Sequence, residues 1–444
     1  MEALDAGLES SDAGSVEGPG TPPERIVREV TKPPQGDALP EMSPSLAWLR
    51  DVLWGGAATT RVELNPVVGV ERSLARDWWV LPSAASPILL VPTSGKAGAR
   101  SLFQFNDSMT QRSRLKKAGV GFAIRGRLAP SFLRDRLSIA DPASDGSRDL
   151  IESELPKLLG VPRVEVAISI GRSLRPNVKP VLQIMASDGR VLAFAKLAWN
   201  PLTTELVENE VATLTRLEGL VIRSLRVPRV LHFGEWNGFR LVLLSPLSHG
   251  LLRRWPVNAL PPSAVFREVA GLGGDWRGPL INGPYWREVS GRALRVAHQL
   301  EDGGRMEATI SKIVAKVSTQ EVIHCMSHGD FAPWNILHTA DSINVWDWER
   351  ASETRPLGVD ALHFTFEVAY HREGRDPKAA IDIALERSRD VLRELGVPRL
   401  AREAIRDVYV LERLTRLLEG RRAAVPVDDR LIEGLAASLI GPRL

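Results

Sequence analysis

The chain has 444 residues, of which 44% are hydrophobic and 25% are charged, as in soluble globular proteins of two or three domains. This composition excludes a collagenous, a disulfide-scaffold and a wholly disordered chain, and the single cysteine, Cys325, cannot form an internal disulfide. The formal net charge of +3 is small and is not concentrated in any basic run, so we expect no binding to nucleic acid.

No stretch of the sequence predicts a membrane span or a secretion signal. The longest apolar runs are interrupted by Pro82 and Pro87 and are much shorter than the roughly 20 residues that a spanning helix needs. The first residues, MEALDAGLESSDAG, carry acids where a signal peptide carries bases. We therefore expect a cytoplasmic protein without a membrane partner, and we make no prediction of its oligomeric state.

The first part of the chain divides into a tail and an accessory region. Residues 1–44 are rich in Gly, Pro, Ser and Glu and lack aromatic residues, which predicts a disordered acidic tail. Residues 45–150 are predicted to form a small accessory α/β domain of unknown role, ending in a loop at 141–148. Within it we expect strands at 77–82, 88–92 and 102–105, and a helix at 109–118.

The remainder predicts two lobes of different character. Residues 151–247 contain a strand–strand–strand–helix–strand order, which is typical of a small antiparallel lobe; the elements are expected at 164–170, 181–186, 191–199, 203–217 and 239–245. Residues 248–444 are predicted to be a mainly helical lobe, with a loop at 271–283 that is a candidate gate for the substrate. Its helices are expected at 285–300, 306–317, 377–395, 399–419 and 428–439.

A lysine and a glutamate in the smaller lobe form the first candidate pair. Lys196 lies on the strand face that Phe194 and Ala198 share, and Glu210 falls inside the apolar stripe of the following helix. An inward helix glutamate and a buried strand lysine are what an ion pair directed at a nucleotide phosphate requires. A lysine that reaches solvent, beside a glutamate at the edge of the stripe, is an equally open interpretation.

The second candidate cluster is SHGDFAPWN at 327–335, followed by INVWDWE at 343–349. Asp330 and Asn335 are five residues apart, the spacing of phosphoryl-transfer catalytic loops. A hairpin centred on Asp341 would pair Asn335 with Asp347, so that two oxygen ligands for Mg²⁺ and a proton-accepting carboxylate converge. Ordinary turn roles explain each residue alone but not the spacing and the hairpin together.

These motifs resemble those of the aminoglycoside phosphotransferase/choline kinase-like family over about residues 160–444. The resemblance implies an α+β, two-lobed protein-kinase-like fold. It also implies an ATP- and Mg²⁺-dependent enzyme that transfers the γ-phosphoryl group to a hydroxyl of a small molecule, such as a sugar, an amino alcohol or an aminoglycoside-like compound. Residues 351–444 hold 16 acidic and 16 basic residues, which does not favour a polycationic acceptor.

The resemblance also assigns roles to single residues. Asp330 would be the catalytic base or a hydroxyl-orienting carboxylate, Asn335 and Asp347 the Mg²⁺ ligands, and Lys196 the phosphate contact held by Glu210. The remaining assignments are Gly171, in a turn at 171–173 over the phosphates; Ser245 and Leu247, in a hinge at 244–247 that meets the adenine; and His328, as a structural hydrogen-bonding residue of the loop.

A few other residues carry weaker expectations. We expect Cys325 to be a small core residue, and a solvated turn is favoured for Asn177 and Lys179 over a phosphate contact. Glu349 is either a support for metal or substrate or a surface carboxylate, and Asp360 is expected to cap the helix that follows it and stabilise the loop. Two other functions remain possible: a non-catalytic kinase-like module that binds nucleotide or a partner, and a scaffold that recruits a partner through residues 45–150.

Overall fold

The structure, a computed structural model, describes most of the chain beyond the amino-terminal segment. The predicted tail up to residue 41 and the loop predicted at 141–148 lie outside the described residues. The described ranges are 42–55, 60–66, 76–104, 111–126, 128–140, 150–171, 175–247, 258–297, 303–317, 320–339, 342–422 and 427–440.

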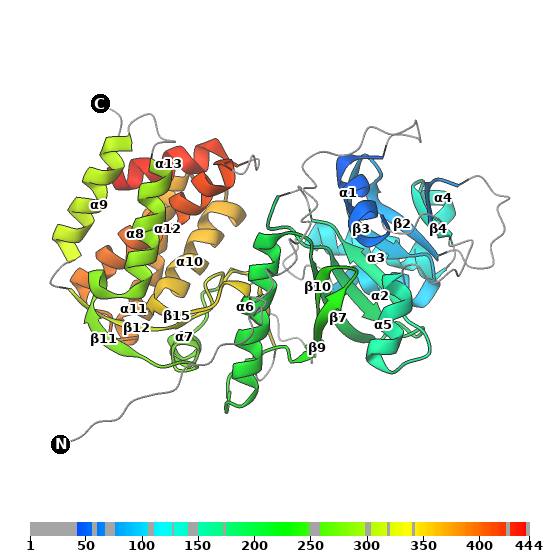
Figure 1. The fold of residues 1–444 in the computed structure, drawn as a ribbon, viewed down its shortest axis with the longest axis horizontal. Helices are drawn as coiled ribbons and strands as arrows, with labels where there is room; N and C mark the ends of the chain where they lie inside the picture. The colour runs from blue at the N-terminus through cyan, green and yellow to red at the C-terminus, as the bar shows by residue number, and fades with distance from the viewer. Residues whose placement is uncertain are drawn as a thin grey trace, which may run out of the picture. The chain divides into compact units, whose positions relative to one another are not determined.

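Nine antiparallel strands form one sheet in the order β1-β4-β2-β3-β5-β6-β7-β10-β9 (Figure 1). The strands are β1 (Arg61–Leu64), β2 (Arg76–Ser83), β3 (Ser86–Pro92), β4 (Arg136–Ala140), β5 (Glu165–Ser169), β6 (Val181–Met185), β7 (Val191–Ala198), β9 (Val230–Trp236) and β10 (Phe239–Leu244). The pairing of β3 with β5 joins strands from before and after residue 150. The sheet therefore crosses the predicted boundary, and a separate accessory domain stays a prediction.

The helices of the first region flank these strands. They are α1 (Pro44–Leu53), α2 (Gly95–Gln104), α3 (Gln111–Arg125), α4 (Ala129–Phe132) and α5 (Ile151–Leu159). The strand predicted at 102–105 is wrong, because residues 102–104 end α2. Short apolar runs do not distinguish a strand from a buried helix segment, and Leu102 packs in a small core with Trp79 and Val91.

Helix α6 (Pro201–Glu218) follows β7 directly and carries Glu210. Asn200 and Thr203 form a capping box at its start, and Pro201 occupies the first turn, where its missing N–H costs nothing. Leu206, Val207, Leu214 and Leu217 are buried on one face, as the apolar stripe predicts. The same face buries Glu210, and α6 contacts both β7 and the 3-10 turn Trp348–Arg350.

The second half of the chain is mainly helical and surrounds one large apolar core (Figure 1). Its helices are α7 (Ser263–Ala270), α8 (Pro284–Val296), α9 (Gly303–Val317), α10 (Val359–Glu367), α11 (Pro377–Glu394), α12 (Arg399–Arg422) and α13 (Asp429–Ile440). Two three-stranded sheets accompany them, in the orders β11-β12-β15 and β13-β14-β8. These strands are β8 (Leu225–Arg226), β11 (Trp276–Pro279), β12 (Glu321–Ser327), β13 (Ile336–His338), β14 (Ile343–Val345) and β15 (Ser352–Pro356).

The α+β class and the order of a sheet-bearing part followed by a helical part are confirmed. The segment predicted as a loop at 271–283 instead contains β11, which pairs with β12, and a 3-10 turn at Leu280–Asn282. No helix within the described residues is both long enough and apolar enough to cross a membrane.

Candidate active site

Lys196 lies on an interior strand of the sheet, β7, which is paired with β6 on one side and β10 on the other. Its ammonium donates to both carboxylate oxygens of Glu210, at 2.8 and 2.7 Å, and to Oδ1 of Asp347 at 2.6 Å. Glu210 has no exposed surface and Lys196 is only 8% exposed. The lysine therefore does not reach solvent, and the predicted ion pair is present.

The charges in this cluster support one another. Burial by itself would lower the pKa of Lys196, but Asp347 and Glu210 raise it above its ordinary value. Burial would raise the pKa of Asp347, and the neighbouring Lys196 and Lys179 lower it instead. At neutral pH the lysine is therefore a cation and Asp347 an anion.

The loop after β12 is fixed by Asp360, in the first turn of α10. The Asp360 carboxylate accepts from Ser327 Oγ at 2.8 Å, from His328 N at 2.8 Å and from Gly329 N at 3.0 Å. His328 Nε2 lies 3.0 Å from the carbonyl oxygen of Trp346, and burial lowers the pKa of this histidine. Both residues thus hold the loop, as expected, but Asp360 does not cap α10, whose N-cap is Gly358 without a side-chain cap bond.

Asp330 and Asn335 are in direct contact within this loop. The Asn335 amide donates from Nδ2 to the Asp330 carbonyl oxygen at 2.9 Å and to Asp330 Oδ2 at 3.0 Å. The other carboxylate oxygen, Oδ1, lies 3.0 Å from Nε2 of His363. Burial would raise the pKa of Asp330, but the hydrogen bond and charge of His363 lower it below its ordinary value. His363 was not predicted, because it lies 33 residues away in α10 and belongs to no motif.

The hairpin that follows differs from its predicted register by one residue. Ile336 pairs with Val345, so Asn335 faces Trp346, whose N–H donates to the Asn335 carbonyl oxygen at 3.1 Å. Asp347 comes one residue later, with a left-handed φ of 69°. The predicted pairing of Asn335 with Asp347 is therefore wrong, although the two residues do lie at the same end of the hairpin.

A second ion pair lies beside the first. Lys179 Nζ is 2.7 Å from Glu349 Oε2, and both side chains are at least nine-tenths buried. The expectation of a solvated turn for Lys179 is therefore wrong, and of the two alternatives for Glu349 the surface carboxylate is excluded. Burial and the nearby Asp347 raise the pKa of Glu349 to about 7. The carboxylates of Glu210, Asp347 and Glu349 offer oxygens within 4.8 Å of one another, and Asp347 is the most exposed of the three. Oxygen ligands of this kind suit Mg²⁺.

The residues predicted to contact the nucleotide follow β5 and β10, and the structure describes only part of their surroundings. Gly171 has a positive φ of 83°, and the residues 172–174 of its turn lie outside the described residues. Ser245 exchanges hydrogen bonds with Arg229, its N–H donating at 2.8 Å and its Oγ accepting at 2.9 Å. Leu247 is half-buried and precedes a break in the described chain. The hinge and the phosphate turn stay predictions.

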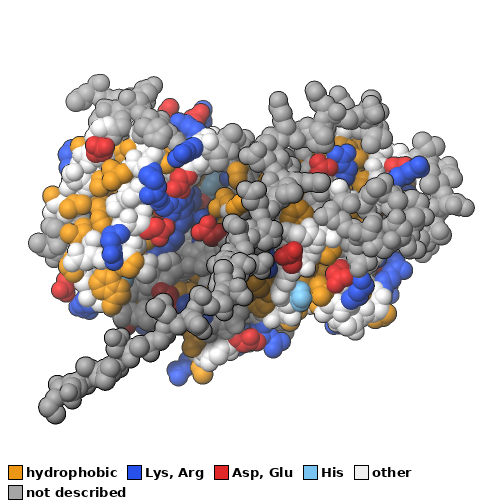
Figure 2. Space-filling model, viewed as in Figure 1, with side chains coloured by type: hydrophobic (Ala, Val, Ile, Leu, Met, Phe, Trp, Pro, Cys, Tyr) orange, Lys and Arg blue, Asp and Glu red, His pale blue; other side chains and the backbone are white. Residues whose placement is uncertain are grey.

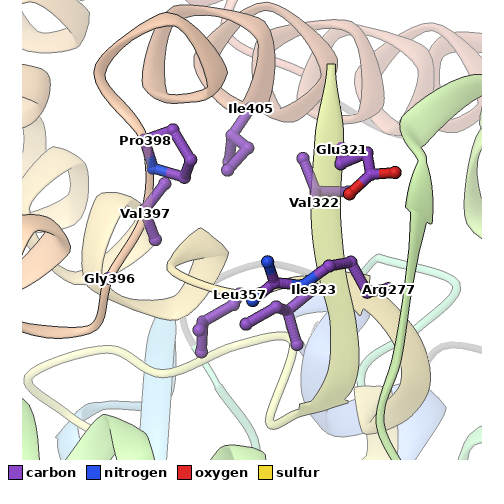
Figure 3. A pocket seen from close by; sticks show the side chains of 9 residues that line it. All are labelled: Arg277, Glu321, Val322, Ile323, Leu357, Gly396, Val397, Pro398 and Ile405. Carbon is purple, nitrogen blue, oxygen red and sulfur yellow. The ribbon is translucent and has the colours of Figure 1, made fainter. Parts of the chain in front are cut away.

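Two further features lie outside this cluster. Burial raises the pKa of Cys325 to about 12, so it is a protonated core thiol, as expected. A cavity of about 40 Å³ lies between β12 and the loop before α12 (Figure 3). In Figure 3 the aliphatic side chains of Val322 and Ile405 line this cavity, with Arg277 and Glu321 at its edge. No residue of the candidate site borders it.

The chain was compared with known proteins. No family model and no curated protein matches it. A solved structure of a thermostable mutant of aminoglycoside phosphotransferase APH(4)-Ia is 16% identical over 65% of this chain and 96% of its own, with a TM-score of 0.44. A putative fructosamine-3-kinase from Haemophilus somnus 129PT is 13% identical over the same shares, with a TM-score of 0.39. A glucosamine kinase is 14% identical over 58% of this chain and 74% of its own, with a TM-score of 0.32.

Proposed function

We propose that the chain is an ATP- and Mg²⁺-dependent phosphotransferase that moves the γ-phosphoryl group to a hydroxyl of a small molecule. The observation that carries the proposal is the joint placement of two charge clusters. Lys196 is hydrogen-bonded to Glu210 and to Asp347, which follows β14. Asp330 and Asn335 are hydrogen-bonded to each other just before β13, the strand that pairs with β14. Phosphoryl transfer depends on such positioning and charge stabilisation rather than on covalent chemistry by the protein.

The side chains fit a magnesium–nucleotide complex. Asn335 uses its amide nitrogen on Asp330, so its Oδ1 is the atom left to act as a ligand, together with the Asp347 carboxylate. Bound Mg²⁺ would supply neutralisation of charge on the phosphate oxygens. Lys196 adds a fixed cation for the phosphates. The exposed fractions of the side chains agree with these roles. Asp330 and Asp347, which would face the acceptor and the metal, are 25% and 29% exposed, whereas Glu210, which holds Lys196, is fully buried.

Asp330 is suited to orient the acceptor. Because its pKa is lowered, it is an anion at neutral pH and accepts a hydrogen bond from the attacking hydroxyl. A weak base of this kind receives the proton only as the bond to phosphorus forms. Its main contribution is therefore to align the oxygen for in-line attack, which is worth several kcal/mol when the geometry is exact.

The charges near Asp330 bear on the class of acceptor. Arg350 and Arg413 both interact electrostatically with its carboxylate. Figure 2 shows Lys and Arg side chains gathered over α8 and α12 with acidic ones between them, and Arg292 there pairs with Glu288 and Glu419. The two arginines beside Asp330 do not favour a polycationic acceptor. Uncharged and anionic hydroxyl compounds therefore come first in a substrate screen.

The test is a phosphorylation screen with γ-labelled ATP and Mg²⁺ across small hydroxyl compounds. We expect transfer by the wild type, none by Asp330→Asn with nucleotide binding retained, and weaker Mg²⁺-dependent nucleotide binding by Asp347→Asn. Asp382→Asn, at an exposed position of α11, is the matched control and should behave as wild type. Full turnover by Asp330→Asn would overturn its role. Nucleotide binding without transfer to any acceptor would favour the non-catalytic module.

A further inference from the structure

His363 is a buried histidine that connects Asp330 to the interior of the helical part. Its side chain is 3% exposed. Nε2 lies 3.0 Å from Asp330 Oδ1, and Nδ1 lies 3.0 Å from the hydroxyl of Tyr409 on α12. Glu367 Oε1 is farther from Nδ1, at 3.7 Å, and accepts a hydrogen bond from Arg413 at 2.8 Å. The imidazole thus has one close partner on each nitrogen.

These partners decide where the imidazole carries its proton. Burial raises the pKa of Tyr409 well above its ordinary value, so the phenol keeps its proton. A phenol that donates to Nδ1 leaves Nε2 to carry the proton that faces Asp330. Asp330 is an anion that can only accept. The order of donation therefore runs from Tyr409 Oη–H to His363 Nδ1, and from His363 Nε2–H to Asp330 Oδ1.

Both oxygens of the Asp330 carboxylate are consequently held. His363 donates to Oδ1, and Asn335 donates to Oδ2 from the opposite side of the loop. The terminal torsion of an aspartate is broad and has no sharp minimum of its own, so hydrogen bonds are needed to fix the plane of the carboxylate. Each oxygen keeps a second lone pair for an acceptor hydroxyl.

The same helix holds the backbone of the loop. Asp360 and His363 are three residues apart on α10 and lie on one face of it. Asp360 binds the backbone N–H groups of His328 and Gly329, and His363 binds the side chain of the next residue. One rigid element therefore sets both the path of the loop and the orientation of Asp330.

We propose that His363 is a positioning residue that holds the Asp330 carboxylate in the plane required to align the acceptor hydroxyl. The proposal rests on the proposed phosphotransferase function. It places the effect of His363 on turnover rather than on nucleotide affinity, because no nucleotide-binding residue of the site touches the imidazole among the contacts within the described chain.

Two variants of nearly equal size separate positioning from packing. His363→Gln keeps an amide that can accept from Tyr409 and donate to Asp330, whereas His363→Met fills a similar volume without a donor. We expect His363→Met to lower kcat by about 10- to 100-fold at an unchanged KM for MgATP, and His363→Gln to restore most of the loss. His324→Gln is the matched control, since His324 is fully buried, bonds Thr354 O and has no contact with Asp330.

A purely structural role predicts a different pattern. Both substitutions would then lower kcat equally, in step with a fall in Tm, and that result would overturn the proposal. Wild-type kcat in His363→Met would overturn it as well.

The ¹⁵N NMR signals of the His363 imidazole, assigned by their loss in His363→Gln, give a readout that needs no turnover. We expect protonation at Nε2, and a changed signal in Asp330→Asn and in Tyr409→Phe. Protonation at Nδ1 alone, or a signal insensitive to Asp330→Asn, would refute the arrangement. A wild type that transfers no phosphoryl group but shows the expected signals would refute the proposed function and leave the contact with Asp330 established.

Discussion

Lys196 is held by two carboxylates, and the interaction between them can be measured. The planned substitutions are Glu210→Gln, Asp347→Asn and the two together, each of which removes a charge with little change of shape. Asparagine tolerates the left-handed backbone of Asp347, so that substitution adds no strain at its φ of 69°. The measured quantity is the free energy of unfolding.

The distances predict a cost for each single variant. At an effective dielectric constant of about 20, a carboxylate 2.7 Å from the ammonium contributes about 6 kcal/mol of attraction. The two carboxylates also repel each other, by about 3.5 kcal/mol at the 4.8 Å limit of their separation. Each single substitution loses the attraction but relieves the repulsion. The expected net cost is therefore about 2.5 kcal/mol, which is within the range for a hydrogen bond to a charged group.

The double variant should cost more than the sum of the single ones. Each single variant removes the repulsion between the two carboxylates, but the double variant can remove it only once. The sum of the two single costs therefore counts about 3.5 kcal/mol of relief twice. When both carboxylates are removed, Lys196 can lose its proton. Deprotonation costs about 1.4 kcal/mol for each pH unit between pH 7 and the ordinary lysine pKa of about 10.4. This limits the excess, and we expect a coupling of about 1–3 kcal/mol.

The assay is urea unfolding at pH 7, followed by far-UV circular dichroism and by the fluorescence of the 12 tryptophans. The two signals must change together for the free energies to be compared. Glu205→Gln, one turn earlier on α6 and exposed, controls for loss of an acid from this helix. If the double variant equals the sum of the singles within about 0.5 kcal/mol, Lys196 is not shared between the two carboxylates.

Three other substitutions test the surroundings of the site. Gly329→Ala would place its Cβ in collision with the Arg350 carbonyl oxygen at a φ of 77°, so the catalytic loop must shift and kcat should fall about 100-fold; unchanged kcat contradicts this. Burial raises the pKa of Glu152, so its contribution to stability is present below its ordinary pKa of 4.5 and is lost as the pH rises through the folded pKa. In urea titrations, Glu152→Gln should therefore gain stability relative to wild type as the pH rises. A relative loss of stability would refute this. Glu412→Gln leaves the buried Arg355 without its carboxylate at 3.0 Å and should cost about 3–5 kcal/mol of unfolding free energy, whereas a loss below about 1 kcal/mol would show that the pair is not desolvated.

The part of the site that depends on local periodicity was predictable. Alternation along β7 places Lys196, and the 3.6-residue period of α6 places Glu210 on its buried face. The two residues are only 14 apart, so one strand-to-helix connection brings them together. Periodicity alone left a solvent-reaching lysine equally open, and the family resemblance was what implied the ion pair.

The hairpin shows where spacing stops being sufficient. Its register depends on the type and length of the turn, and a shift of one residue exchanges the faces of a strand. The structure pairs Ile336 with Val345. With this register and an extended backbone, the Asp347 side chain would point away from Lys196. Its left-handed conformation turns the carboxylate to Lys196 instead. The hairpin and the convergence of Asn335 and Asp347 at one end of it were predicted, whereas the register, the left-handed backbone of Asp347 and its contact with Lys196 were not.

His363 could not be identified from a sequence pattern, and the reason lies in α10, the helix that carries it. All nine residues of α10 are buried, and a helix buried on every side has no amphipathic period to detect. A carboxylate is favoured at a helix start, so Asp360 could be noticed in the sequence, although its bond to Ser327 spans 33 residues, as does that of His363 to Asp330. His363 has no such local signal. Motif spacing preserves the groups that contact substrate, because the chemistry dictates their identity and separation. The groups that orient them need only supply a donor at the right point in space, so they can come from any element that packs there.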